Sequence, residues 1–180
     1  MMLRRDVLDK IGYFDEDFFM YGEELDLSWR INLAGNKIYC VPGSVIYHLG
    51  RGTAGRSEHR KMSEYLLHKN HFLVLFKNYS SKTLSSILPI KLLLEIIAFF
   101  AFLFVKPETS YAIYRTFLWL VANTKMLIKK HNDLKKIRRL SDEEIKKRMI
   151  NHSVPILYYL GGKKYFKDYI RYMPYLNIKD

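Results

Sequence analysis

A long apolar stretch in the middle of the chain limits the folds that this sequence can adopt. Residues 84–105 are mostly Leu, Ile, Phe and Ala, and they approach the length of about 20 apolar residues that crosses a bilayer as a helix. Lys91 and Glu95 interrupt the stretch, but their spacing lets them pair along one helix face. After a break, residues 111–128 predict a second apolar helix. The two form a helical hairpin that either associates with a membrane or is buried in a protein core.

Charge is distributed unevenly along the chain, whose net charge is +12. Residues 1–60 hold eight Lys or Arg and nine Asp or Glu, whereas residues 61–180 hold 22 Lys or Arg and nine Asp or Glu. Positive charge beside apolar helices is typical of contact with anionic lipids. The basic segment 129–148 fits such a contact, and a solvated charged helix is the alternative. We expect an anionic membrane surface as a partner and no nucleic acid, because no known nucleic-acid recognition pattern is present.

A concentrated group of carboxylates predicts the start of a helix over residues 23–34. Glu23, Glu24 and Asp26 fall within four residues, and negative charge is favoured in the first turn of a helix, where backbone N–H groups are free. A glycine follows the expected end. Asp26 and Arg30 are spaced to form an ion pair along one face. On this pattern alone, the segment is a well-capped surface helix.

The remaining elements are predicted from periodicity and turn residues. Helices are expected over residues 3–11 and 57–79, and Ser80-Ser81-Lys82-Thr83 is expected to be a linker and helix cap before the next helix. Two short strands are expected at 37–41 and 45–48, because β-branched and aromatic residues surround a Pro-Gly turn there.

Several motifs in the first 60 residues occur in an order that resembles one enzyme family. They are Ile11-Gly12-Tyr13-Phe14-Asp15-Glu16, Phe18-Phe19-Met20-Tyr21, Glu23-Glu24-Leu25-Asp26-Leu27-Ser28-Trp29-Arg30, Ala34-Gly35, Val41-Pro42 and His48. In order and spacing they resemble the second half of a family 2 glycosyltransferase of the GT-A fold, in its rhamnosyltransferase-like branch. The resemblance implies an α+β fold, mostly helical, in which the chain is a C-terminal fragment of the GT-A α/β domain with helical additions.

Together, the resemblance and the apolar pattern divide the chain into three parts. Residues 1–80 are expected to be the C-terminal, acceptor-side portion of the glycosyltransferase domain, 81–128 the membrane-associated hairpin and 129–180 a basic helical tail. Within the tail, Ser141 begins a capping-box pattern, and a further short helix is expected around 163–172. The family's nucleotide-binding units and its Asp-x-Asp metal motif precede the matched region, and we expect the chain to lack both.

The resemblance also implies the chemistry. In an inverting transfer, a carboxylate removes the proton of the acceptor hydroxyl as that oxygen attacks the sugar. Glu24 occupies the position of this base, and Glu23 and Asp26 are the neighbouring catalytic carboxylates that shape the acceptor site. The donor is a nucleotide-sugar, and a divalent metal, Mg or Mn, stabilises its leaving diphosphate.

Five further residues are candidates for binding. Trp29 and Arg30 are expected to frame the acceptor, with core packing as the alternative for Trp29. Arg51 and Arg56, in a glycine-rich loop, are expected to bind the acceptor or diphosphate oxygens, and solvated loop arginines are the alternative. His48 is a candidate metal ligand, or else a structural histidine.

These expectations describe an enzyme of polysaccharide or cell-wall synthesis. It is expected to act on a glycan or lipid-linked acceptor at the cytoplasmic face of a bacterial or archaeal membrane, together with an upstream-encoded N-terminal half. The 180 residues are expected to be inactive alone. The alternative is a non-catalytic module that only binds the membrane.

Overall fold

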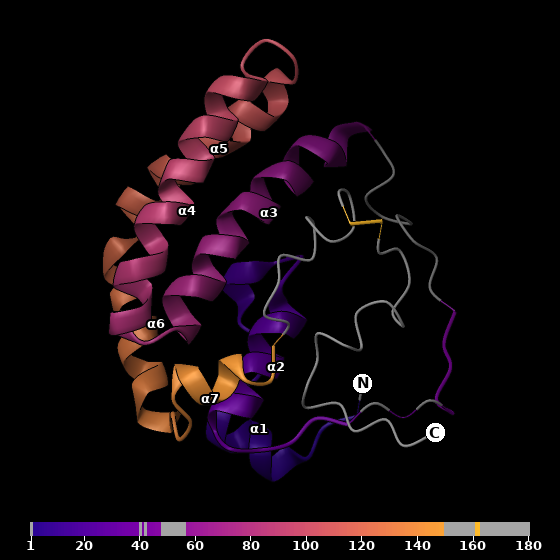
Figure 1. The fold of residues 1–180 in the computed structure, drawn as a ribbon. Helices are drawn as coiled ribbons and strands as arrows, with labels where there is room; N and C mark the ends of the chain where they lie inside the picture. Colours follow the sequence, from indigo (N-terminus) through magenta and orange to yellow (C-terminus); the bar gives the residue numbers. More distant parts are fainter. Residues whose placement is uncertain (1, 40, 42, 48–56, 150–160, 163–180) are drawn as a thin grey trace. The chain divides into compact units, whose positions relative to one another are not determined.

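The computed structural model describes residues 2–39, 41, 43–47, 57–149 and 161–162. Its elements, of which the α-helices are labelled in Figure 1, are α1 (Arg5–Ile11), the short 3-10 helix η1 (Glu16–Phe18), α2 (Glu23–Leu33), α3 (Ser57–Asn78), α4 (Ser81–Phe102), α5 (Pro107–Ala122), α6 (Thr124–Ile137) and α7 (Asp142–Lys146). The chain forms two compact units, Met1–Arg138 and Arg139–Asp180. The candidate functional site, described below, lies in the first unit. The three-part division expected from the sequence stays a prediction.

The described residues contain no strand, so the predicted α+β fold class is wrong. The GT-A fragment that the resemblance implied is wrong for the same reason. Residues 37–39 and 45–47 carry the side chains that suggested strands, but their backbone is irregular. A strand needs a neighbouring strand that pairs with its N–H and C=O groups. No such neighbour is present in the described part of the chain, where every regular element is helical.

Helix α3 is the centre of the first unit. It contacts α2, α4, α5, α6 and η1, and Figure 1 shows it between the α4–α5 hairpin and α2. Phe72 and Leu73 on this helix are fully buried. A smaller apolar cluster joins α1 to α2 through Ile11, Leu27 and Ile31. The apolar cluster with α1 and the contact with α3 together hold α2 in place. The candidate carboxylates lie in the first turn of α2.

Several predicted helix boundaries are confirmed. Helix α2 begins at Glu23 as expected. The Ser80 side chain caps α4 by accepting the Thr83 N–H, and Ser141 forms a full capping box with Glu144. The predicted helix over 163–172 lies outside the described residues.

The second apolar helix is shorter than predicted, because the segment 111–128 is divided at Asn123. This residue leaves helical geometry, with φ −108° and ψ 16°. Its backbone N–H and its side-chain amide both donate to the carbonyl oxygen of Trp119, at 2.9 Å each. Local side-chain hydrogen bonds of Asn compete with the helical pattern in this way. Helix α5 therefore ends with the apolar residues, and the basic sequence continues as the separate helix α6.

Candidate functional site

The backbone between η1 and α2 adopts a strained conformation directly before the candidate carboxylates. Phe19, Tyr21 and Gly22 have φ of 60°, 70° and 91°. Such conformations cost non-glycine residues about 1–3 kcal/mol each and persist only where the surroundings enforce them. Gly22 is the N-cap of α2, so this loop determines where the helix, and with it Glu23 and Glu24, begins.

A single side chain of α3 holds the strained loop. The Asn70 amide nitrogen lies 3.0 Å from the carbonyl oxygen of Phe18, 2.7 Å from that of Met20 and 2.6 Å from that of Tyr21. Asn70 is buried, and its two amide protons are shared among three carbonyls that the tight turn directs to one point. These bonds stabilise the conformation that the backbone alone disfavours.

Lys69, the neighbour of Asn70, holds the same loop from a second position. Its ammonium donates to the backbone carbonyl of Asp17 and lies 5.2 Å from the centre of the Trp119 ring. Burial lowers the pKa of Lys69, and the nearby carboxylates of Asp17 and Asp15 oppose this effect. The loop is therefore fixed to α3 by both polar residues of one dipeptide.

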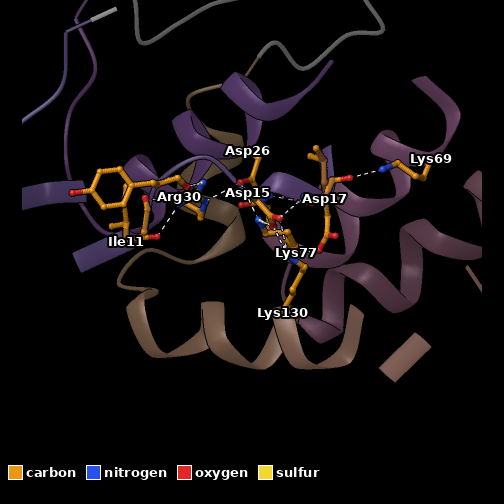
Figure 2. Close-up of polar contacts among 12 residues, drawn as sticks. Ile11, Asp15, Asp17, Asp26, Arg30, Lys69, Lys77 and Lys130 are labelled. Carbon is orange, nitrogen blue, oxygen red and sulfur yellow. Dashed lines mark hydrogen bonds and ion pairs between the residues drawn. The ribbon is translucent and has the colours of Figure 1, made fainter. Parts of the chain in front are cut away.

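Beneath the loop, Asp26 is the centre of a buried polar network (Figure 2). Its carboxylate is fully buried and accepts from Arg30 Nε at 2.8 Å, Lys77 Nζ at 2.9 Å and Asn78 Nδ2 at 3.0 Å. All three donors are themselves buried. A buried carboxylate needs such partners. These contacts support a positioning role for Asp26, and its predicted role as a catalytic carboxylate that shapes the acceptor site stays untested.

Arg30 ties α2 to the end of α1. Besides its bond to Asp26, the guanidinium donates to the carbonyl oxygens of Ile11 at 2.8 Å, Gly12 at 2.9 Å and Tyr13 at 2.7 Å. The predicted Asp26–Arg30 pair is thus confirmed, but it lies in the interior and not on a surface face. The donors of Arg30 are engaged by the protein, and its predicted contact with an acceptor stays untested.

Asp15 and Asp17 bring a second group of charges to the loop. The Asp15 carboxylate accepts from Lys77 and Lys130, which Figure 2 shows pointing toward it, and Asp17 pairs with Lys130 at 2.7 Å. Burial raises the pKa of Asp15, but the hydrogen bonds from Lys130 and Lys77 outweigh this and hold it at about 2.

Asp15-Glu16-Asp17 is an Asp-x-Asp triplet, so the expectation that the chain lacks this pattern was wrong. Because lysine ammonium groups pair with both aspartates, the triplet offers no free pair of carboxylates to a cation. No group of three metal-binding side chains occurs among the residues that the structure describes. We therefore assign no step to a metal, and the predicted Mg or Mn stays a prediction.

The two remaining carboxylates differ in environment. Glu24 is exposed on the first turn of α2. Glu23 is half-buried, and its Oε2 atom is buried without a hydrogen-bond partner in the described part of the chain. An exposed carboxylate at a helix N-terminus, such as Glu24, can accept a proton from an approaching hydroxyl. The buried oxygen of Glu23 is an acceptor whose capacity for a hydrogen bond is unused among the described residues.

Other predicted site residues are either packed or outside the described part. Trp29 is buried, and its ring makes an edge contact with Tyr79 at 4.8 Å between centres, which supports the core-packing alternative. His48, Arg51 and Arg56 lie outside the described residues, and their roles stay predictions.

The sequence contained a signal for the residues that hold the loop, and it was missed. The dipeptide Lys-Asn occurs at 69–70 and again at 77–78, about two helical turns apart. This spacing brings both copies to one side of α3, where they meet the loop and Asp26. Lys130 gave no such signal, because it lies in a run of basic residues.

Comparison with known proteins gives one distant similarity. No family model and no solved structure matches the chain. Over 80 residues it is 30% identical to N-acetylglucosaminyl-diphospho-decaprenol L-rhamnosyltransferase of Mycobacterium tuberculosis, in the strains CDC 1551 / Oshkosh and ATCC 25618 / H37Rv. The alignment covers 44% of this chain and 25% of the relative, so the chain spans about a quarter of the length of these curated relatives. The similarity supports kinship with glycosyltransferases.

Proposed function

We propose that this chain carries the acceptor-binding part of an inverting glycosyltransferase, with Glu24 as the general base. The observation that carries the proposal is the exposed Glu24 carboxylate on a helix start that is held from below. The Asn70 amide fixes the strained loop before α2, and the buried Asp26 network fixes the helix itself. A firmly held helix start suits a reaction that depends on the position of the carboxylate it carries.

In the proposed step, the Glu24 carboxylate takes the proton of an acceptor hydroxyl. The freed oxygen attacks the anomeric carbon of the donor sugar, a new carbon–oxygen bond forms, and the bond from that carbon to the diphosphate breaks. The nucleoside diphosphate leaves with the bonding electrons, and the configuration at the carbon is inverted. Glu23, half-buried beside Glu24, is proposed to shape the acceptor site, and Asp26 positions the helix.

The relatives suggest the class of acceptor. Their name describes an acceptor in which N-acetylglucosamine is carried on a diphospho-decaprenol lipid. For this chain we propose a sugar carried on a lipid diphosphate, reached at the cytoplasmic face of the membrane. Because the matched stretch is a quarter of the relatives' length, we also propose that another polypeptide part binds the nucleotide-sugar, and that the 180 residues alone do not transfer sugar.

The experiment is a transfer assay in membranes of the source cells, in which any companion part is present. The native chain is replaced by the wild-type chain or by Glu24→Gln, and transfer from a panel of radiolabelled nucleotide-sugars to extractable lipid is counted. Loss of a general base lowers the rate by about 10²–10⁴-fold. Glu108→Gln is the matched control, because Glu108 is also an exposed glutamate in the first turn of a helix. Wild-type transfer by Glu24→Gln would exclude Glu24 as the base.

A further inference from the structure

Helix α4 presents an apolar face that no described part of the chain covers. Its outward side chains recur every three or four residues, so they form one stripe along the helix and into the following turn. They are Ile90, Leu93, Leu94, Ile97, Phe100 and Phe104. Phe104, in the turn before α5, is 91% exposed. A row of this length exceeds the isolated apolar residues that soluble surfaces normally show.

Lys91 and Glu95 of α4 are turned away from this face. Glu95 is only 4% exposed and pairs with Lys91 on the same helix and with His68 Nδ1 of α3, at 2.8 Å for the histidine. The Lys91 ammonium also lies 5.4 Å from the centre of the buried Phe72 ring. The two charges that interrupt the apolar sequence therefore face α3, and they leave the outer face of that stretch without charge.

Helix α5 buries several polar side chains and exposes apolar ones. Besides Ala112 and Ile113, it buries Thr109, Ser110 and Thr116 toward the interior. Ser110 donates to the carbonyl of Phe99 in α4 at 2.8 Å, and Thr116 donates to a carbonyl within its own helix. On the other side it exposes apolar and aromatic side chains at helical spacing. These are Tyr111, Tyr114, Leu118 and Val121.

Apolar surroundings would explain why α4 and α5 both expose apolar side chains. Among the described helices, α4 is long and apolar enough to cross a bilayer, and only 11% of its most apolar window is buried. A core helix of a soluble protein is mostly buried. Burial of exposed Leu, Ile and Phe side chains is favourable in proportion to the apolar area removed from water, so an uncovered row of them favours an apolar partner.

Helix α6 identifies the kind of apolar partner. It follows α5 after a single residue and exposes lysines. These are Lys125, Lys129, Lys135 and Lys136. Asp133 is its acidic residue, and it pairs with Lys136. Basic residues beside an apolar surface attract anionic lipid head groups, and tyrosines are favoured at the membrane–water interface.

We propose that the outer face of α4 and α5, here named the hairpin surface, binds an anionic lipid bilayer. The apolar side chains enter the boundary between head groups and acyl chains, and the lysines of α6 contact the head groups. This inference rests on exposure and charge in α4–α6 and does not depend on the proposed sugar transfer.

The test is flotation of the purified chain with vesicles of phosphatidylcholine, with and without phosphatidylglycerol. The wild type is expected to float with the anionic vesicles, and added salt is expected to weaken binding. The double substitution Phe100→Ser and Phe104→Ser is expected to lower the partition coefficient by at least about tenfold. The control is Ile46→Ser with Tyr47→Ser, since both residues are exposed and apolar but lie outside the hairpin surface. Equal flotation of both double variants and the wild type would overturn the proposal.

A second readout places the surface directly. In a background with Trp29→Phe and Trp119→Phe, which leaves no tryptophan, Leu118→Trp places one on the exposed side of α5, and brominated acyl chains are expected to quench its fluorescence on binding. Light scattering without lipid distinguishes the other occupant of an apolar face. A wild type that forms a dimer, loses it with Phe100→Ser and Phe104→Ser, and shows no quenching by brominated lipid would assign the surface to a second copy and overturn the lipid proposal.

Discussion

Replacement of Asp26 by Asn tests how much the buried network contributes to the fold. The substitution keeps the shape of the side chain and removes the charge that faces Arg30 Nε at 2.8 Å and Lys77 Nζ at 2.9 Å. All three side chains are almost completely buried. Removal of one partner from a buried ion pair costs about 3–5 kcal/mol, because the other charge stays buried without compensation. Asp15 still pairs with Lys77, so we expect the free energy of unfolding to fall by about 3 kcal/mol.

The free energy of unfolding is measured by urea denaturation, followed through the fluorescence of buried Trp29. Asp133→Asn is the control, because Asp133 forms an exposed pair with Lys136, and its stability is expected to stay close to that of the wild type. The double variant Asp26→Asn with Lys77→Met is expected to be more stable than the sum of its single changes, since both charges are then absent. A loss below about 1 kcal/mol for Asp26→Asn, equal to the control, would refute a stabilising buried network.

Two further changes test the loop before α2. Gly22→Ala is expected to destabilise the fold by about 1–2 kcal/mol, because Gly22 has φ 91° and a β-carbon disfavours that conformation. Urea denaturation measures this change. The control is Gly43→Ala, which is expected to leave stability unchanged because the new β-carbon would lie in open space. The low pKa of Asp15, about 2 in the folded chain against 3.8 ordinarily, stabilises the fold above pH 4, and up to about 2 kcal/mol is lost as the pH falls from 4 to 2. Unfolding measured across that range is expected to show a smaller loss in Asp15→Asn, and an identical pH profile would contradict the assignment.

Local signals in the sequence predicted the helices well. Carboxylates marked the start of α2, and Ser80 and Ser141 marked two others. These features act within one helical turn, so a single sequence contains the information needed to read them. The prediction of two strands was wrong for the opposite reason. A strand forms only beside a partner strand, and its own residues do not specify that partner.

The candidate site was predictable only in part. The spacing of Asp26 and Arg30 predicted their ion pair, but the burial of that pair depends on Lys77 and Asn78, which lie 51 and 52 residues away from Asp26 in the chain. The repeated Lys-Asn dipeptide marks one side of α3, but no pattern in the sequence indicates that Asp26 is its partner. The exposed apolar residues of α4 show the same limit, because composition identified the helix and only the structure revealed that Lys91 and Glu95 face inward.

The most direct test of the account is the rate of sugar transfer by Glu24→Gln, measured separately from acceptor binding. The assay uses source membranes with a varied concentration of lipid-linked acceptor, so that kcat and KM are resolved. A general base acts in the transition state, and we therefore expect a kcat about 100-fold lower or less with a KM close to wild type. An unchanged kcat in Glu24→Gln, or an equal fall of kcat in Glu108→Gln, would contradict it.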